Sequence, residues 1–250
     1  MDVSLYQAAA AMSATARWQD LIAENLSAAS IPGSRRQEVS FSDVQAGLAS
    51  GTTSTQQPGF YIPSVKTTTN FQPGEMRSTG NPMDFALEGP GFFGVQMPGG
   101  QTAYTRDGEF QVNAKGQLVN KQGYAVMGQG GPIQFNPNDS HAITVSPTGE
   151  VSQGDQPVGK LQTVEFKEPA KLTKLSTSLF TADPTTLKPT PSGSTQVRQG
   201  FVEGANGSPT TEMASMITAM RMFEANEKVL QMQSDRMTRV INDLGGTSSS

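Results

Sequence analysis

The sequence contains one glycine motif of the kind that binds phosphate groups in dinucleotide enzymes. Gly89, Gly91 and Gly94 satisfy the spacing G-x-G-x-x-G, and Glu109 follows about twenty residues after the first glycine. A phosphate cradle needs the last glycine to open a helix, yet the residues after Gly91 are typical of a strand, and Pro90 removes an amide donor. We therefore interpret the motif as a tight turn between two strands.

Few residues are available for nucleophilic or metal-assisted catalysis. His141 is the only histidine and the chain has no cysteine, so a zinc site lacks its usual ligands, and a Ser-His-Asp triad has no G-x-S-x-G motif to build on. Carboxylates such as Glu150 and Asp155 are scattered rather than paired. We predict no catalytic residue, no cofactor and no metal. A hydrolase stays open as an alternative, because two carboxylates can converge from distant strands.

Charge and hydropathy limit the partners. The net charge of −4 argues against a broad grip on nucleic acid, and no apolar run approaches the roughly 20 residues of a membrane-spanning helix. We predict neither nucleic-acid binding nor direct membrane insertion. The start of the chain does not resemble a signal peptide, because Asp2 comes first and Arg17 follows the alanine stretch. If the protein leaves the cytoplasm, we expect another route.

The elements that must position any functional residue are helices at the two ends of the chain. From Asp2 to Ser30 the sequence has neither glycine nor proline, and Pro32-Gly33 then predicts a break. Near the other end, Pro209 suits the first helical position and Gly245-Gly246 supplies a stop. The sequence therefore predicts two long terminal helices.

Each predicted helix carries an apolar seam at spacings of three and four residues, which is typical of helices that pair. The N-terminal seam is weak in its middle, so it is too thin to be stable alone. We predict that the two seams form a polymer interface through Leu5, Met12, Ile22, Leu26, Met213, Met216, Met220, Phe223, Leu230, Met237, Ile241 and Leu244.

Between the helices the pattern changes to short strands and glycine-rich turns, which predicts an antiparallel, meandering β domain. The fold class is α+β, with long N- and C-terminal helices forming a discontinuous coiled-coil domain and a central antiparallel β-rich domain. We predict these boundaries: N-terminal helix and break 1–45, extended linker 46–75, central β domain 76–180, second linker 181–200, C-terminal helix 201–250.

Several segments resemble the flagellar basal-body rod and hook protein family. Thr79–Gly89 (TGNPMDFALEG) and Tyr104–Phe110 (YTRDGEF) are similar to central motifs of the family. Val197–Asn206 (VRQGFVEGAN) and Glu212–Asn226 are similar to its C-terminal blocks, and Ile22–Ala28 to the end of its N-terminal helix. Together the similar segments cover both ends and the middle of the chain.

The resemblance implies a structural subunit of the basal-body rod, of the proximal or distal type, that polymerises helically and carries torque from motor to hook. The implied partners are copies of itself, neighbouring rod or hook subunits, and the flagellar type III export apparatus. The implied location is the periplasm-spanning rod, reached without a cleaved signal peptide. The alternative classes are a secreted β-rich surface adhesin and an uncharacterised hydrolase.

Overall fold

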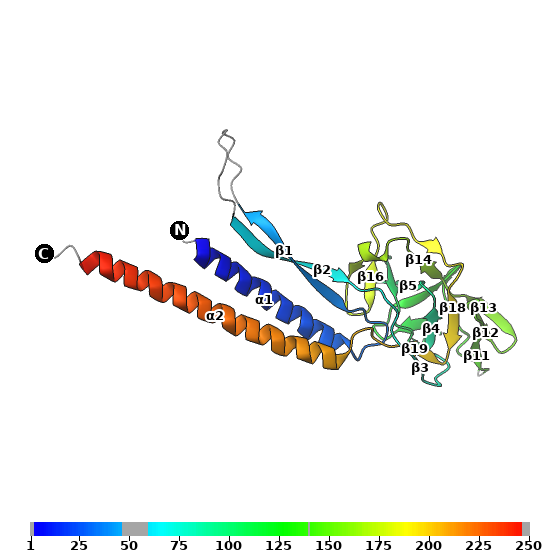
Figure 1. Cartoon of the computed structure of the whole chain (residues 1–250). Helices are drawn as coiled ribbons and strands as arrows, with labels where there is room; N and C mark the ends of the chain where they lie inside the picture. The colour runs from blue at the N-terminus through cyan, green and yellow to red at the C-terminus, as the bar shows by residue number, and fades with distance from the viewer. Residues whose placement is uncertain (1–2, 47–59, 140, 247–250) are drawn as a thin grey trace. The chain divides into compact units, whose positions relative to one another are not determined.

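The computed structural model describes residues 3–46, 60–139 and 141–246. Two α-helices stand at the ends of the described chain, and short strands joined by turns and loops lie between them (Figure 1). Two compact units can be separated. The first combines Met1–Leu26, Gln37–Thr68 and Pro209–Ser250, and the second combines Ser27–Arg36 with Thr69–Ser208. Residues 47–59 of the predicted linker 46–75 lie outside the described residues.

Helix α1 (Val3–Ala28) ends where the sequence predicts a break. The Ile31 N–H donates to the Ala28 carbonyl at 3.0 Å, and Gly33 then adopts φ +68°, a left-handed conformation that favours glycine. A Cβ at Gly33 would lie 2.1 Å from the Asp107 nitrogen, so the chain passes here at a distance that only glycine allows. Sharp reversal and close approach together explain the Pro32-Gly33 pair.

The first unit contains α1, helix α2 (Pro209–Gly246) and a ribbon of two paired strands, β1 (Gln37–Ala46) and β2 (Phe60–Thr69). The ribbon packs on α1 through Trp18 and Phe41, whose rings meet edge to face with centroids 5.7 Å apart. The first unit is therefore a mixed helix and strand assembly rather than a helix pair.

The predicted coiled coil between the terminal helices is wrong, although the α+β class holds. On α2, Met213 and Met220 of the predicted seam are 55% and 53% exposed. The covered face runs instead through Ala219, which is fully buried, and Asn226, which donates to Thr15 Oγ1 at 3.1 Å. A shift of one residue turns a helix by about 100°, so Met213 and Met220 point away from the covered face, and only Met216, Phe223 and Leu230 of the α2 seam are half-buried on it.

The second unit is built from antiparallel strands. Its largest sheet has ten strands in the main order β15-β16-β6-β5-β9-β8-β7, with β10 on β9 and β14 between β5 and β17. The other sheets are β11-β12-β13, β18-β4 and β19-β3. The bounds are β3 (Met76–Ser78), β4 (Phe85–Glu88), β5 (Phe92–Gln96), β6 (Thr102–Thr105), β7 (Phe110–Val112), β8 (Leu118–Asn120), β9 (Ala125–Gly128), β10 (Gly131–Pro132), β11 (Ile143–Val145), β12 (Glu150–Gln153), β13 (Gln156–Lys160), β14 (Thr163–Glu165), the 3-10 turn η1 (Pro169–Lys171), β15 (Thr173–Lys174), β16 (Leu179–Thr181), β17 (Thr190–Pro191), β18 (Gln196–Gln199) and β19 (Phe201–Glu203).

The last two strands close the unit by pairing with its first two. Val197 of β18 lies opposite Leu87 of β4, and Val202 of β19 lies opposite Arg77 of β3. Two hydrophobic clusters fill the interior, and one of them is largely aromatic. The larger includes Phe85, Phe93, Val95, Leu118, Val126 and Leu161, and the smaller includes Phe92, Tyr104, Phe166, Leu172 and Phe180.

The glycine motif is a turn between strands, as the sequence predicted. β4 ends at Glu88, Gly89 takes φ +133°, and β5 begins at Phe92, so no helix follows the glycines. The Gly91 N–H, which a phosphate would require, donates to Thr195 Oγ1 at 2.9 Å. This motif therefore does not form a dinucleotide site.

Candidate assembly surface

The predicted interface residues divide into an exposed set and a covered set. On α2, Met213, Met220, Met237 and Ile241 are between 40% and 61% exposed. The covered set comprises Met216, Phe223 and Leu230 of α2, which are half-buried, and Met12, Leu26 and Ile22 of α1, of which Ile22 is 2% exposed. The side chains of Leu5 and Leu244 lie outside the described residues. The polymer interface itself stays a prediction.

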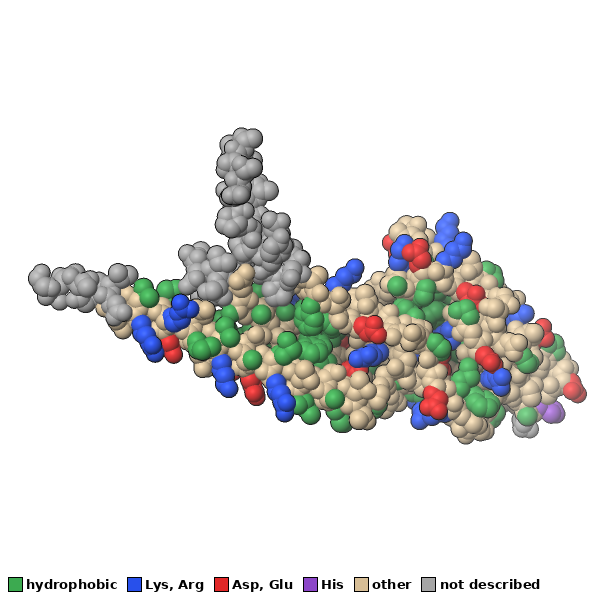
Figure 2. All heavy atoms as spheres, viewed as in Figure 1, with side chains coloured by type: hydrophobic (Ala, Val, Ile, Leu, Met, Phe, Trp, Pro, Cys, Tyr) green, Lys and Arg blue, Asp and Glu red, His purple; other side chains and the backbone are tan. Residues whose placement is uncertain are grey.

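Helix α2 exposes further apolar side chains that the seam did not include. They are Ile217 (55%), Met222 (46%), Val229 (39%), Met232 (58%) and Val240 (52%). Figure 2 shows hydrophobic side chains along the visible face of α2, interspersed with charged ones. A helix with apolar residues on all sides is typical of one that is surrounded by partners. These apolar residues are visible in the sequence, but a pattern that selects a single seam leaves them out.

Asn25 fixes the direction in which the chain leaves α1. Its Nδ2 donates to the Gln37 carbonyl at 2.8 Å, and its Oδ1 accepts from the Gln37 N–H at 2.9 Å. This pair of hydrogen bonds to the N–H and C=O of one residue mimics strand pairing, and Asn25 is buried. The side chain thereby positions β1 against the helix.

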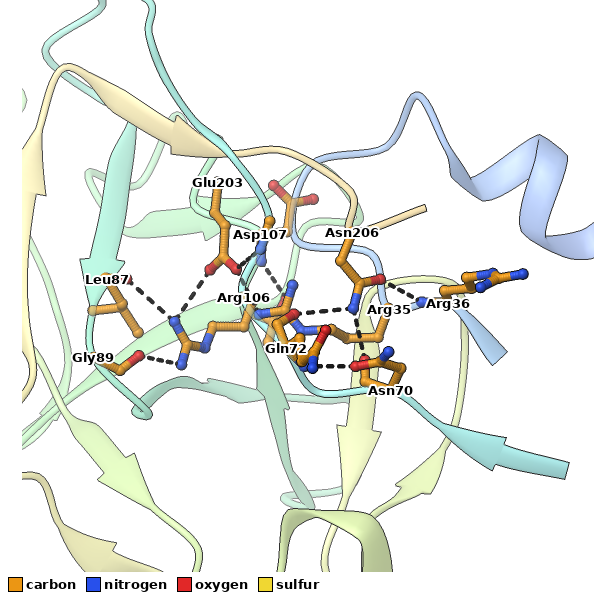
Figure 3. A network of polar contacts seen from close by, with 12 residues as sticks. Arg35, Arg36, Asn70, Gln72, Leu87, Gly89, Arg106, Asp107, Glu203 and Asn206 are labelled. Atoms are coloured by element: carbon orange, nitrogen blue, oxygen red, sulfur yellow. Dashed lines mark hydrogen bonds and ion pairs between the residues drawn. The ribbon is translucent and has the colours of Figure 1, made fainter. Parts of the chain in front are cut away.

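A buried ionic network lies in the second unit and is centred on Glu203 of β19 (Figure 3). Glu203 is 1% exposed. Its Oε1 accepts from Arg35 Nη2 at 2.6 Å and from the Gly74 N–H at 2.8 Å, and its Oε2 accepts from Arg106 Nη1 at 3.1 Å. One carboxylate therefore ties the segment after α1, the segment before β3 and the turn after β6.

Arg106 is the most connected member of the network. Its guanidinium also donates to the carbonyls of Leu87 and Gly89 and lies over the Phe92 ring, 5.1 Å from the centroid. Burial lowers the pKa of Arg106 to about 10, against the opposing influence of Glu203, so the side chain remains a cation at neutral pH. The fold thus holds two buried guanidiniums, those of Arg35 and Arg106, against one carboxylate.

Asp107 is the second buried carboxyl of this region, and it is less well compensated. Burial raises its pKa to about 6, and a hydrogen bond from the Glu109 N–H to Oδ1, at 3.1 Å, opposes that rise. The folded chain therefore keeps Asp107 largely ionised at neutral pH at a cost in stability.

Asn206 links the chain after β19 to two neighbouring backbone segments, one at Arg36 and one at Asn70 to Gln72 (Figure 3). Its Oδ1 accepts from the Arg36 N–H at 2.7 Å, and its Nδ2 donates to the carbonyls of Asn70 and Gln72 at 2.8 and 2.9 Å. All of its side-chain bonds go to backbone atoms. The side chain thus cross-links its own segment to the other two and holds the three backbone segments together.

Sequence reasoning singled out the motifs that hold these residues but assigned them no contacts. Arg106 and Glu203 are 97 residues apart, and no spacing rule connects them. The available signal was that the YTRDG and VEGAN segments combine charged residues with glycine between apolar strands. Such residues are typical of buried polar clusters as well as of surface turns.

The described residues offer little for catalysis or metal binding. Both oxygens of Glu203 are occupied by arginine, His141 is exposed and contacts Asp139, and no three His, Asp or Glu side chains within 3–46, 60–139 and 141–246 could hold a metal ion. Across the same ranges, no helix has the length and apolar content needed to cross a bilayer.

Comparison with known proteins places the chain in a family. Residues 86–153 match the family described as the flagellar hook protein FlgE/F/G D1 domain, and residues 198–244 match the flagellar basal body rod FlgEFG protein C-terminal family. The chain is 32% identical over 249 residues to the flagellar basal-body rod protein FlgF of Mesorhizobium japonicum, covering 99% of this chain and 100% of that protein. It is 33% identical over 264 residues to the flagellar basal-body rod protein FlgG of Borreliella burgdorferi, covering 96% of this chain and 98% of that protein. These similarities confirm the resemblance found in the motifs: the chain belongs to the family of flagellar basal-body rod proteins.

Proposed function

We propose that this chain is built into the rod through α2, whose exposed apolar side chains are covered by other subunits. Family membership makes the chain a structural subunit of the flagellar basal-body rod and not an enzyme. The rod is made of such subunits, so the partners are neighbouring rod or hook subunits, among which we include copies of this chain.

The observation that carries the proposal is the number of large apolar side chains that α2 leaves in water. Met213, Ile217, Met220, Met232 and Ile241 are each more than half exposed. Fully burying one such side chain stabilises a contact by about 1.5–3 kcal/mol, so covering half of each gives roughly 1 kcal/mol per residue. Several of them on one helix supply the driving force for a stable subunit contact.

We propose that the contact is heterologous, with the exposed apolar side chains of α2 lying against a different surface of the next subunit. Repetition of such a contact without closure produces an open helical filament. A filament of this kind can carry torque from motor to hook, and this is the mechanical role that we propose for the chain.

We further propose that the subunit reaches the periplasm-spanning rod through the flagellar type III export apparatus, without a cleaved signal peptide. Family membership supports this route. In a strain that lacks the export gate, the full-length chain should accumulate inside the cell. Its appearance in the periplasm of that strain, shortened at the N-terminus, would contradict the proposal.

The exchange of Ile217 for glutamate tests the assembly surface. Ile217 is 55% exposed, so Ile217→Glu should leave the fold of the free subunit within about 0.5 kcal/mol of wild type. In a deletion strain, the variant should fail to restore rods and motility because a charge replaces a buried contact. Electron microscopy of basal bodies and swimming assays measure both.

Leu175→Glu is the matched control. Leu175 is 47% exposed but belongs to the second unit, which is built from strands and is called the β unit from here on. It lies between β15 and β16. This variant should restore rods and motility as wild type does. Normal rods with Ile217→Glu would refute the assignment of α2 as the assembly surface, whereas failure of both variants would show that the effect is not specific to that helix.

A further inference from the structure

We infer that α2 carries a set of oxidation-sensitive methionines, and that their conversion to the sulfoxide disables the free subunit for assembly. The set consists of Met213, Met220, Met222, Met232 and Met237. The inference rests on the proposed function of α2 as the assembly surface, and it adds a modification site to that surface.

Exposure separates these methionines from the others that the structure describes. The five are 55%, 53%, 46%, 58% and 40% exposed in the order given. By contrast, Met83, Met97 and Met127 are half-buried in the β unit, the first two packed against its larger hydrophobic cluster. Met12 and Met216 are likewise half-buried on the helices. An oxidant in water therefore meets the α2 set first.

The chemistry needs a two-electron oxidant, and we name hydrogen peroxide. The thioether sulfur attacks one peroxide oxygen, an S–O bond forms as the O–O bond breaks, and the second oxygen leaves as water after proton transfer. Methionine is oxidised to methionine sulfoxide and peroxide is reduced to water. A thiol-dependent methionine sulfoxide reductase reverses the change by reducing the S–O group.

Oxidation should weaken assembly, because the proposed role of these side chains is to be buried in an apolar contact between subunits. A sulfoxide is a strong hydrogen-bond acceptor, so burying it in an apolar contact leaves a polar group without a partner. The fold of the free subunit depends little on these side chains, because each is already 40–58% exposed to water. Oxidation should therefore lower assembly while it leaves the subunit folded. Subunits already in the polymer should be protected, because neighbouring subunits cover the same sulfur atoms.

The test begins with the full-length subunit in solution, treated with hydrogen peroxide and followed by peptide mass spectrometry. We expect the five α2 methionines to gain oxygen before Met83, Met97 and Met127. The treated subunit is then assayed for polymerisation by sedimentation and electron microscopy. We expect the critical concentration to rise about tenfold or more, which corresponds to about 1.4 kcal/mol. Reductase treatment should restore it, and polymer oxidised after assembly should stay intact.

Two variants make the test specific. A subunit with all five residues changed to leucine keeps the apolar surface but removes the sulfur atoms, and it should polymerise equally well before and after peroxide. A control with leucine at Met83, Met97 and Met127 should remain as sensitive as wild type. Equal peroxide sensitivity of the five-leucine variant, or normal polymerisation of wild type carrying sulfoxide at all five sites, would overturn the inference. Failure of untreated wild type to polymerise would instead count against the proposed function.

Discussion

Replacing Glu203 with glutamine removes the one negative charge that the buried guanidiniums of Arg35 and Arg106 share. Glu203 is 1% exposed, and the two arginines are 1% and 4% exposed, so water cannot take over the lost interaction. Glutamine keeps one acceptor oxygen but turns an NH2 group toward a guanidinium. Breaking a buried ion pair by removing one partner costs about 3–5 kcal/mol. We expect Glu203→Gln to destabilise the β unit by an amount in this range.

Urea unfolding followed by far-ultraviolet circular dichroism and by tyrosine fluorescence measures the loss. Glu88→Gln is the matched control, because Glu88 pairs with Arg198 at 2.6 Å while both side chains remain 51% exposed. An exposed pair of this kind contributes at most about 1 kcal/mol. If Glu203→Gln loses no more stability than Glu88→Gln, the buried network is a geometric coincidence and not a source of stability.

Folding raises the pKa of Asp107 from 3.8 to about 6, so its stabilising effect is complete below about pH 4 and is lost as pH rises through 6. The free energy of unfolding of Asp107→Asn should thus exceed that of wild type by about 2–3 kcal/mol at pH 7.5, with little difference at pH 4. Urea unfolding at the two pH values measures this, and a difference that does not change with pH would contradict it. Gly33→Ala should lower the free energy of unfolding by more than about 2 kcal/mol in the same assay. Its Cβ would lie 2.1 Å from the Asp107 nitrogen, and the backbone has φ +68°, which disfavours a side chain. Gly130→Ala, whose Cβ meets nothing within 4 Å, should be nearly neutral, and equal losses would exclude the steric explanation.

Features set by neighbouring residues could be predicted from the sequence. The break after α1 follows from Pro32-Gly33, and the start of α2 at Pro209 follows from the preference of proline for the first helical turn. The strand-turn-strand reading of Gly89 to Gly94 also holds, because the aromatic residues after Gly91 favour strand. In each case a few adjacent residues determine the backbone.

Features set by distant residues could not be predicted in the same way. Apolar spacing located the amphipathic helices but found only part of the covered face of α2, because Ala219 and Asn226 are small or polar and score poorly in any hydrophobic pattern. The pairing of Arg106 with Glu203 depends on strands that the chain brings together only after folding. Buried charge is rare enough that a sequence pattern favours the surface for both residues.

The same contrast explains why the two units differ in what they need from their surroundings. Glu203 and Asn206 find their partners within the β unit, whose interior is closed by strands from both ends of its sequence. In α2, the side chains from Ser234 to Asn242 are all exposed, so this stretch gains no described tertiary packing. Helical stretches of this length are marginal in water without such packing. In the proposed assembly, covering α2 with other subunits would therefore bury its apolar side chains and stabilise the helix that presents them, so assembly and helix stability would be coupled.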